Sequence, residues 1–222
     1  MTDTAVQPEN EFAQVPATAA DVGVSPPPVS RRWVNITAGG HVSGVTWGSG
    51  SPEIVLLHRS GGDARTLDRV ALLLDRPALV IDLPGAGRSS GPASTPRRAA
   101  RDVAEAVASF APRANVVVGV GDGGLVAIAV AARRSQLDTV VLVDTAPGSE
   151  PDVVRDHHWR LSAGITLIHT TEGPLTASDL ADLRLLLPSI AVVGIDTPGL
   201  IETEGAGRLA AALRRIKKGV VA

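Results

Sequence analysis

The 222-residue sequence contains no cysteine and no tyrosine, and only two phenylalanines. The absence of cysteine excludes disulfide bonds, thiolate metal ligands and cysteine nucleophiles. The formal net charge of -2 gives no electrostatic reason to expect nucleic acid as a partner. The apolar runs are short and interrupted, so none approaches the roughly 18 residues that a membrane span needs. We therefore expect no nucleic-acid partner, no membrane span, no metal and no cofactor.

Basic residues are missing from the start of the chain, where the first one is Arg31. A secretory signal needs a basic n-region, so we expect cytoplasmic localisation. Residues 1–30 are rich in proline and acidic side chains, which predicts a disordered N-terminal tail. The remainder, residues 31–222, is long enough for one α/β domain. The scarcity of lysine beside abundant alanine, valine and glycine is typical of a GC-rich bacterial genome.

Short apolar runs alternate with helical patterns along the rest of the chain. Apolar residues alternate with polar ones over residues 32–47, on both sides of Gly39 and Gly40, which predicts a hairpin. The later apolar runs are continuous, as in strands that are buried on both faces. Alternating strands and helices predict an α/β fold with a mostly parallel sheet and helices on both faces. These later strands are expected at 54–58, 78–82, 115–119, 139–143, 165–169 and 191–195.

A glycine-rich turn, VVVGVGDGG, joins one of these strands to a helix. Its glycines Gly119, Gly121 and Gly124 satisfy G-x-G-x-x-G, in which bare backbone lets a pyrophosphate approach a helix N-terminus. Asp144 ends the next strand roughly 20 residues later, where an acid binds a ribose hydroxyl in dinucleotide sites. Position argues against this interpretation, because a hairpin and two further strands precede the turn. A dinucleotide binder therefore remains one alternative.

Four segments resemble the α/β-hydrolase family in sequence, order and spacing: IVLLHRSGG, ALVIDLPGAGRSSGP, VVVGVGDGGLVAIAVAARR and TVVLVDTAPG. They stand where that family shows its oxyanion loop, its D-x-P-G-x-G-x-S motif, its nucleophile elbow G-x-S-x-G-G and its L-V-x-D motif. The resemblance runs from about Trp33 to Ile216 and implies an α/β-hydrolase fold. Only residues 146–164 lie where many members carry a cap, so the cap domain is expected to be absent or minimal.

The resemblance places a degenerate elbow at Gly119, Gly121, Asp122 and Gly123. Gly121 takes the position of the nucleophile, and glycine has no side chain with which to attack a carbonyl. Asp122 is adjacent, but the register that puts glycines in the two flanking positions points its side chain elsewhere.

The other parts of the family's site are altered as well. In the oxyanion loop His58 keeps the family identity, whereas Arg59 replaces a glycine. No histidine follows His169, although the family places its general base after the last strand. The acid positions implied by the resemblance fall on Asp144, Glu172 and Gly173.

These departures predict a catalytically inactive pseudo-hydrolase, a pseudoenzyme that acts through binding. It would serve as an interaction or scaffold subunit with a protein partner or a second copy of itself, or bind a small molecule in the vestigial pocket. The alternative is an esterase-like hydrolase with an atypical site that uses Asp122 or Glu172. A dinucleotide binder using Gly119, Gly121 and Gly124 is the remaining alternative.

Overall fold

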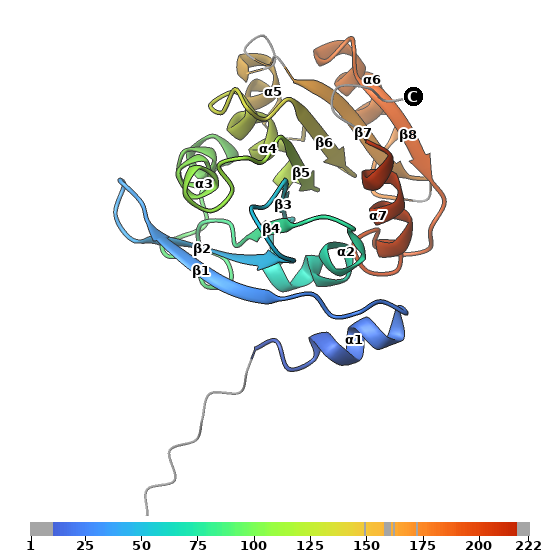
Figure 1. The fold of residues 1–222 in the computed structure, drawn as a ribbon. Helices are drawn as coiled ribbons and strands as arrows, with labels where there is room; N and C mark the ends of the chain where they lie inside the picture. The colour runs from blue at the N-terminus through green and yellow to red at the C-terminus, as the bar shows by residue number, and fades with distance from the viewer. Residues whose placement is uncertain (1–10, 149, 158–160, 162, 172, 217–222) are drawn as a thin grey trace, which may run out of the picture.

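An eight-stranded sheet forms the centre of the molecule (Figure 1). The computed structural model describes residues 11–148, 150–157, 161, 163–171 and 173–216. The strands follow the order β1-β2-β4-β3-β5-β6-β7-β8. β2 pairs antiparallel with both β1 and β4, and every other neighbouring pair is parallel. Their bounds are β1 Val29–Asn35, β2 His41–Trp47, β3 Ile54–Leu57, β4 Ala78–Ile81, β5 Val116–Val120, β6 Thr139–Val143, β7 Gly164–Thr170 and β8 Ala191–Ile195.

Two apolar cores lie on the two faces of this sheet. Alternate residues of a strand point to opposite faces, so Val55 and Leu57 of β3 enter one core while Ile54 and Leu56 enter the other. This explains why the central strands are continuous apolar runs. The helices that cover the first core are α3 (Pro96–Phe110), α4 (Gly123–Ala131), α5 (Pro151–His157) and α6 (Ala177–Leu186). The second core is covered by α1 (Val15–Asp21), the 3-10 turn η1 (Ala64–Leu67), α2 (Asp68–Leu73) and α7 (Ala206–Arg215).

The predicted α/β class and the mostly parallel sheet are confirmed. The hairpin begins three residues before its predicted start and ends at the predicted residue, and the later strands lie within one residue of their predicted bounds. A 3-10 turn, η1, directly precedes α2, and the Asp63 side chain caps it by accepting a hydrogen bond from the Arg65 N–H at 2.8 Å. Between β6 and β7 the described residues contain one short helix, α5, which agrees with a minimal cap.

The N-terminal segment differs from the expected disordered tail over residues 11–30. Residues Val15–Asp21 form α1, and Val15 and Ala19 are buried in the second core. Figure 1 shows α1 beneath the sheet, beside the start of β1. Burial of a small apolar face stabilises a helix that its own sequence would not. Residues 1–10, the first part of the predicted tail, lie outside the described residues.

Within the described residues, no helix combines the length and the apolar character that crossing a bilayer requires.

Candidate active site

Three neighbouring parallel strands bring the altered motif residues to one edge of the sheet. β3 leads into His58 and Arg59, β5 leads into Gly121, and β6 leads into Asp144. The carboxyl ends of parallel strands are where open α/β sheets bind ligands. The structure therefore gathers the sequence-predicted site residues into one region.

The glycines of the elbow allow close approach between parts of the protein itself. A Cβ atom at Gly119 would lie 2.2 Å from the carbonyl oxygen of Gly123, and one at Gly124 would lie 2.1 Å from Thr145 Oγ1. A Cβ atom at Gly123 would lie 2.4 Å from the carbonyl oxygen of His58. The space beside these glycines is thus occupied by protein, so internal packing accounts for them without a bound pyrophosphate.

Gly121 sits in the strained turn that carries the nucleophile in the family. Its φ of +57° lies in the left-handed region, and a Cβ atom there would be 3.0 Å from Arg59 Cβ. The guanidinium of Arg59 forms an ion pair with Glu202, with Nη2 donating to Oε2 at 2.9 Å and Nε 2.5 Å from Oε1. Glu202 is buried and belongs to the loop after β8, where the family carries its histidine. Arg59 therefore lies beside Gly121 and links the oxyanion loop to the loop after β8.

Asp122 makes the second notable contact of the elbow. Its carboxylate accepts a hydrogen bond from the Ser60 N–H at 2.7 Å and another, shorter one from the Ser60 hydroxyl. Both side chains are exposed to solvent. A hydroxyl that donates to a carboxylate has the hydrogen-bond arrangement that general-base activation of a nucleophile requires. The structure therefore directs Asp122 toward the oxyanion loop.

His58 has both ring nitrogens engaged in hydrogen bonds. Nδ1 lies 2.7 Å from the carbonyl oxygen of Arg59, and Nε2 lies 3.0 Å from the N–H of Leu83. Because a carbonyl only accepts and an N–H only donates, the ring is protonated at Nδ1 and accepts at Nε2. His58 is buried and joins two loops, which leaves it no nitrogen for a substrate proton.

The acid positions meet at the end of β7. Asp144 is buried, and its Oδ1 accepts hydrogen bonds from the Thr170 N–H at 2.8 Å and from Thr170 Oγ1 at 3.2 Å. Its φ of 45° is positive, which no other non-glycine residue among those described shows. A Cβ atom at Gly173 would meet Thr170 Oγ1 and lie 3.2 Å from Asp144 Oδ1. The Thr170 side chain, which donates to Asp144, thus fills the space that an acid at 173 would need, and Glu172 lies outside the described residues.

Two cavities open beside the Ser60–Asp122 pair, and both residues line each of them. The first, of about 510 Å³, also contacts His58, Leu83 and Ala93. The second, of about 700 Å³, extends over Gly121 toward Asp144 and Pro147. These volumes suit a small organic ligand.

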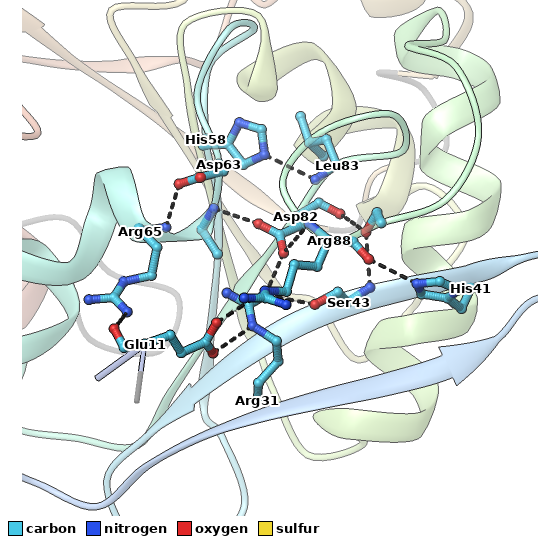
Figure 2. A network of polar contacts seen from close by, with 12 residues as sticks. Glu11, Arg31, His41, Ser43, His58, Asp63, Arg65, Asp82, Leu83 and Arg88 are labelled. Carbon is cyan, nitrogen blue, oxygen red and sulfur yellow. Dashed lines mark hydrogen bonds and ion pairs between the residues drawn. The ribbon is translucent and has the colours of Figure 1, made fainter. Parts of the chain in front are cut away.

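The loop after β4 keeps the D-x-P-G-x-G-x-S motif and forms a buried polar network (Figure 2). Asp82 accepts hydrogen bonds from Arg31 Nη1 at 2.5 Å, from the Ala64 N–H at 2.7 Å and from the Arg88 N–H at 3.1 Å. Arg31 also donates through Nε to Glu11 at 2.7 Å. Burial acts to lower the pKa of Arg31, but the hydrogen bond with Glu11 and the charge of Asp82 outweigh it and raise the pKa. The network fixes the oxyanion loop, the loop after β4 and the N-terminal segment to one another.

Comparison with known proteins agrees with this arrangement. The sequence pattern of the alpha/beta hydrolase family matches residues 54–216. The chain belongs to the α/β-hydrolase family. This membership covers every strand from β3 onward and confirms the predicted resemblance and fold.

The relatives of this α/β-hydrolase include named esterases. The esterase Rv0045c of Mycobacterium tuberculosis (strain ATCC 25618 / H37Rv) is 34% identical over 145 residues, which are 63% of this chain and 47% of that protein. The chain thus matches about half the length of that relative. A crystal structure of the same esterase has a TM-score of 0.81 at 24% identity, covering 94% of this chain and 98% of that one. A thioesterase domain from the curacin biosynthetic pathway has a TM-score of 0.73 at 13% identity, covering 85% and 100%.

The similarity to a named esterase contradicts the prediction of a catalytically inactive pseudoenzyme that acts through protein or small-molecule binding. It favours the alternative, an esterase-like hydrolase. The prediction rested on the absence of a nucleophile, a histidine base and a properly placed acid at the family's own positions, together with the altered oxyanion loop. A hydroxyl and a carboxylate nevertheless lie together at Ser60 and Asp122. Ser60 directly follows the altered oxyanion position, and Asp122 directly follows the altered nucleophile position.

Sequence reasoning missed Ser60 and Glu202. A serine in a glycine-rich loop has no characteristic pattern, and Ser60 gains meaning only from a partner 62 residues away. Glu202 lies in the loop that was searched for a histidine, and its pairing with Arg59 spans 143 residues. The large residue at the oxyanion glycine was the one available signal, since even a partly buried arginine is stabilised by a carboxylate partner.

Proposed function

We propose that this protein is an esterase-like hydrolase in which Asp122 is the general base. The observation that carries the proposal is the contact of the Asp122 carboxylate with both the N–H and the hydroxyl of Ser60. Membership of the α/β-hydrolase family and the similarity to an esterase support the reaction class. The two cavities beside the pair give an ester access to it.

Ser60 is the nucleophile of the proposed reaction. Its Oγ attacks the ester carbonyl carbon while the Asp122 carboxylate takes the Oγ proton, and the alcohol then leaves with that proton. Water hydrolyses the acyl-serine with the same carboxylate as base, which releases the acid and restores Ser60. α4 begins directly after Asp122, and the positive end of its helix dipole favours the negative charge that develops on the carbonyl oxygen.

A carboxylate is a weaker base toward a hydroxyl than imidazole is, so turnover should be slow. Enzymes of this kind that lose the whole triad keep on the order of 10³ to 10⁴ over water through binding and charge stabilisation alone. The proposed pair adds general-base catalysis, worth roughly 100-fold or more, to that level.

Hydrolysis of para-nitrophenyl acetate by the full chain tests the proposal. Asp122→Asn, which keeps the shape of the side chain but not its basicity, should lower kcat/KM by roughly 100-fold, and Ser60→Ala should do the same. Asp75→Asn and Ser189→Ala, both at exposed positions, serve as matched controls and should stay within about twofold. Activity that survives in Asp122→Asn contradicts the assignment. If kcat/KM falls in Asp122→Asn but not in Ser60→Ala, the nucleophile is water and not Ser60.

A further inference from the structure

A second serine, Ser90, is hydrogen-bonded to a histidine away from the elbow. Ser90 Oγ lies 2.7 Å from His41 Nδ1, and His41 Nε2 lies 2.9 Å from the carbonyl oxygen of Arg88. Figure 2 shows His41, at the start of β2, beside the loop that carries Arg88. The serine of the family's D-x-P-G-x-G-x-S motif is Ser89. Ser90 therefore lies outside the part of the loop that the family pattern explains.

The hydrogen bonds determine which nitrogen of His41 carries the proton. A carbonyl oxygen only accepts, so Nε2 donates its hydrogen to Arg88. Nδ1 then presents a lone pair, and the Ser90 hydroxyl donates to it. Nucleophile, base and a third group that orients the base thus stand in the order that activates a serine.

The backbone holds this pair in place. The Ser90 N–H donates to the carbonyl oxygen of His41 at 2.9 Å, and the His41 N–H donates back to Ser90 Oγ at 3.2 Å. Gly40 has a positive φ, and a Cβ atom there would lie 2.9 Å from Ser90 Cβ. The glycine of the hairpin therefore leaves room for Ser90 to approach the strand. The two reacting groups are positioned by two backbone segments and not by their side chains alone.

Ser90 also lines a cavity of about 380 Å³. Most of its lining residues are apolar or glycine, and α3 contributes one arginine and a buried aspartate to the lining. The cavity shares Pro84, Ala93 and Ser94 with the 510 Å³ cavity of the elbow, so the segment around Ala93 separates the two. The lining includes Ile36, Pro84, Pro92, Ala93, Arg98 and Asp102.

We infer that Ser90 and His41 form a second nucleophilic site, which reacts with small apolar acyl esters and with their organophosphorus analogues. Ser90 Oγ attacks the acyl carbon, His41 Nδ1 takes the Oγ proton, and the leaving alcohol departs with it. Water then releases the acid in the same way. The inference is independent of Asp122, because it uses a different nucleophile, base and cavity.

Labelling of the full chain with an alkyl fluorophosphonate tests the inference. The Oγ–P bond forms, the P–F bond breaks, fluoride leaves, and the proton of Oγ passes to His41. Cleavage after arginine places Ser60 in the peptide 60–65 and Ser90 in the peptide 89–97, so mass spectrometry separates the two sites. Fragmentation of the second peptide then distinguishes Ser90 from Ser89 and Ser94. We expect the adduct on Ser90.

Ser90→Ala should abolish that adduct, and His41→Gln should slow its formation by roughly 100-fold, the contribution of a general base. Ser89→Ala is the matched control, because its hydroxyl donates to the Asp82 carbonyl oxygen at 2.6 Å and is not available. Asp122→Asn should leave the labelling of Ser90 unchanged while it slows any labelling of Ser60, which separates this inference from the proposed function. Thermal unfolding shows that each variant is folded. No adduct on Ser90, or an equal rate in a folded His41→Gln variant, overturns the inference.

Discussion

The loop after β4 and the elbow after β5 lie at the same edge of the sheet but differ in how they use their residues. The loop after β4 keeps the family motif, and its Asp82 is buried with donors from three parts of the chain. The elbow has lost the family's nucleophile, and its Asp122 is exposed beside Ser60. The difference teaches that the motif that holds the loops together can be kept while the residues of the nucleophile elbow change.

The largest expected effect is a loss of stability when the polar network of the loop after β4 is broken. Asp82→Ala leaves the buried guanidinium of Arg31 without one of its two carboxylates, and removal of one partner of a buried pair costs about 3–5 kcal/mol. Chemical unfolding measures this loss. Asp156→Ala, which removes an exposed partner of Arg97, should cost less than about 1 kcal/mol. Similar losses in the two variants would show that the network does not stabilise the fold.

The next effect compares Asp82 with a buried carboxylate that has fewer donors. Asp68 pairs with Arg65 at 2.5 Å, and its Oδ1 makes no hydrogen bond within the described residues. Burial raises the pKa of Asp68 from 3.8 to about 6. Because the folded-state pKa lies above the unfolded value, ionisation of Asp68 destabilises the fold above pH 6. That penalty decreases as the pH falls through 6 and is gone below about 4.

Asp68→Asn removes the titration, so its stability relative to the natural chain should be higher at pH 8 than at pH 4, by up to about 3 kcal/mol. Unfolding by urea at both pH values measures this difference. Asp75→Asn is exposed and should show no such dependence. An equal relative stability of Asp68→Asn at the two pH values would contradict the raised pKa.

The smallest of the three effects concerns the elbow. Arg59→Ala leaves the buried Glu202 without its partner, and since the arginine is partly exposed we expect a loss of about 2 kcal/mol, below that of a fully buried pair. The double variant Arg59→Ala with Glu202→Gln should recover part of the loss, because no charge is then buried alone. Additive losses in a double-mutant cycle would show that the two residues do not interact.

Much of the fold could be predicted from the sequence, because strands that are buried on both faces consist of continuous apolar runs, such as IVLL in β3. The N-terminal helix was missed for the opposite reason. The segment VPATAAD has little helical signal of its own, and only its contacts with the second core stabilise it.

The candidate site could be predicted only in its location. The glycine turn and the strand ends identify which edge of the sheet carries the site, since parallel strands place their carboxyl ends together. The contacts that give Arg59, Ser60 and Asp122 their roles join loops that are distant in the sequence. Such contacts between distant residues cannot be inferred from a single sequence, because local propensity and periodicity depend only on neighbouring residues.

The contact between Glu11 and Arg31 has a practical consequence for fragments of this protein. A fragment starting at Val15 retains all of α1 and discards the carboxylate that partly neutralises a guanidinium beneath the loop after β4. Such a trimmed form would keep the buried Arg31–Asp82 pair but lose the second carboxylate on this guanidinium, and its loops would be less firmly held than those of the longer chain. Expression designs that begin at or before Glu11 avoid this defect.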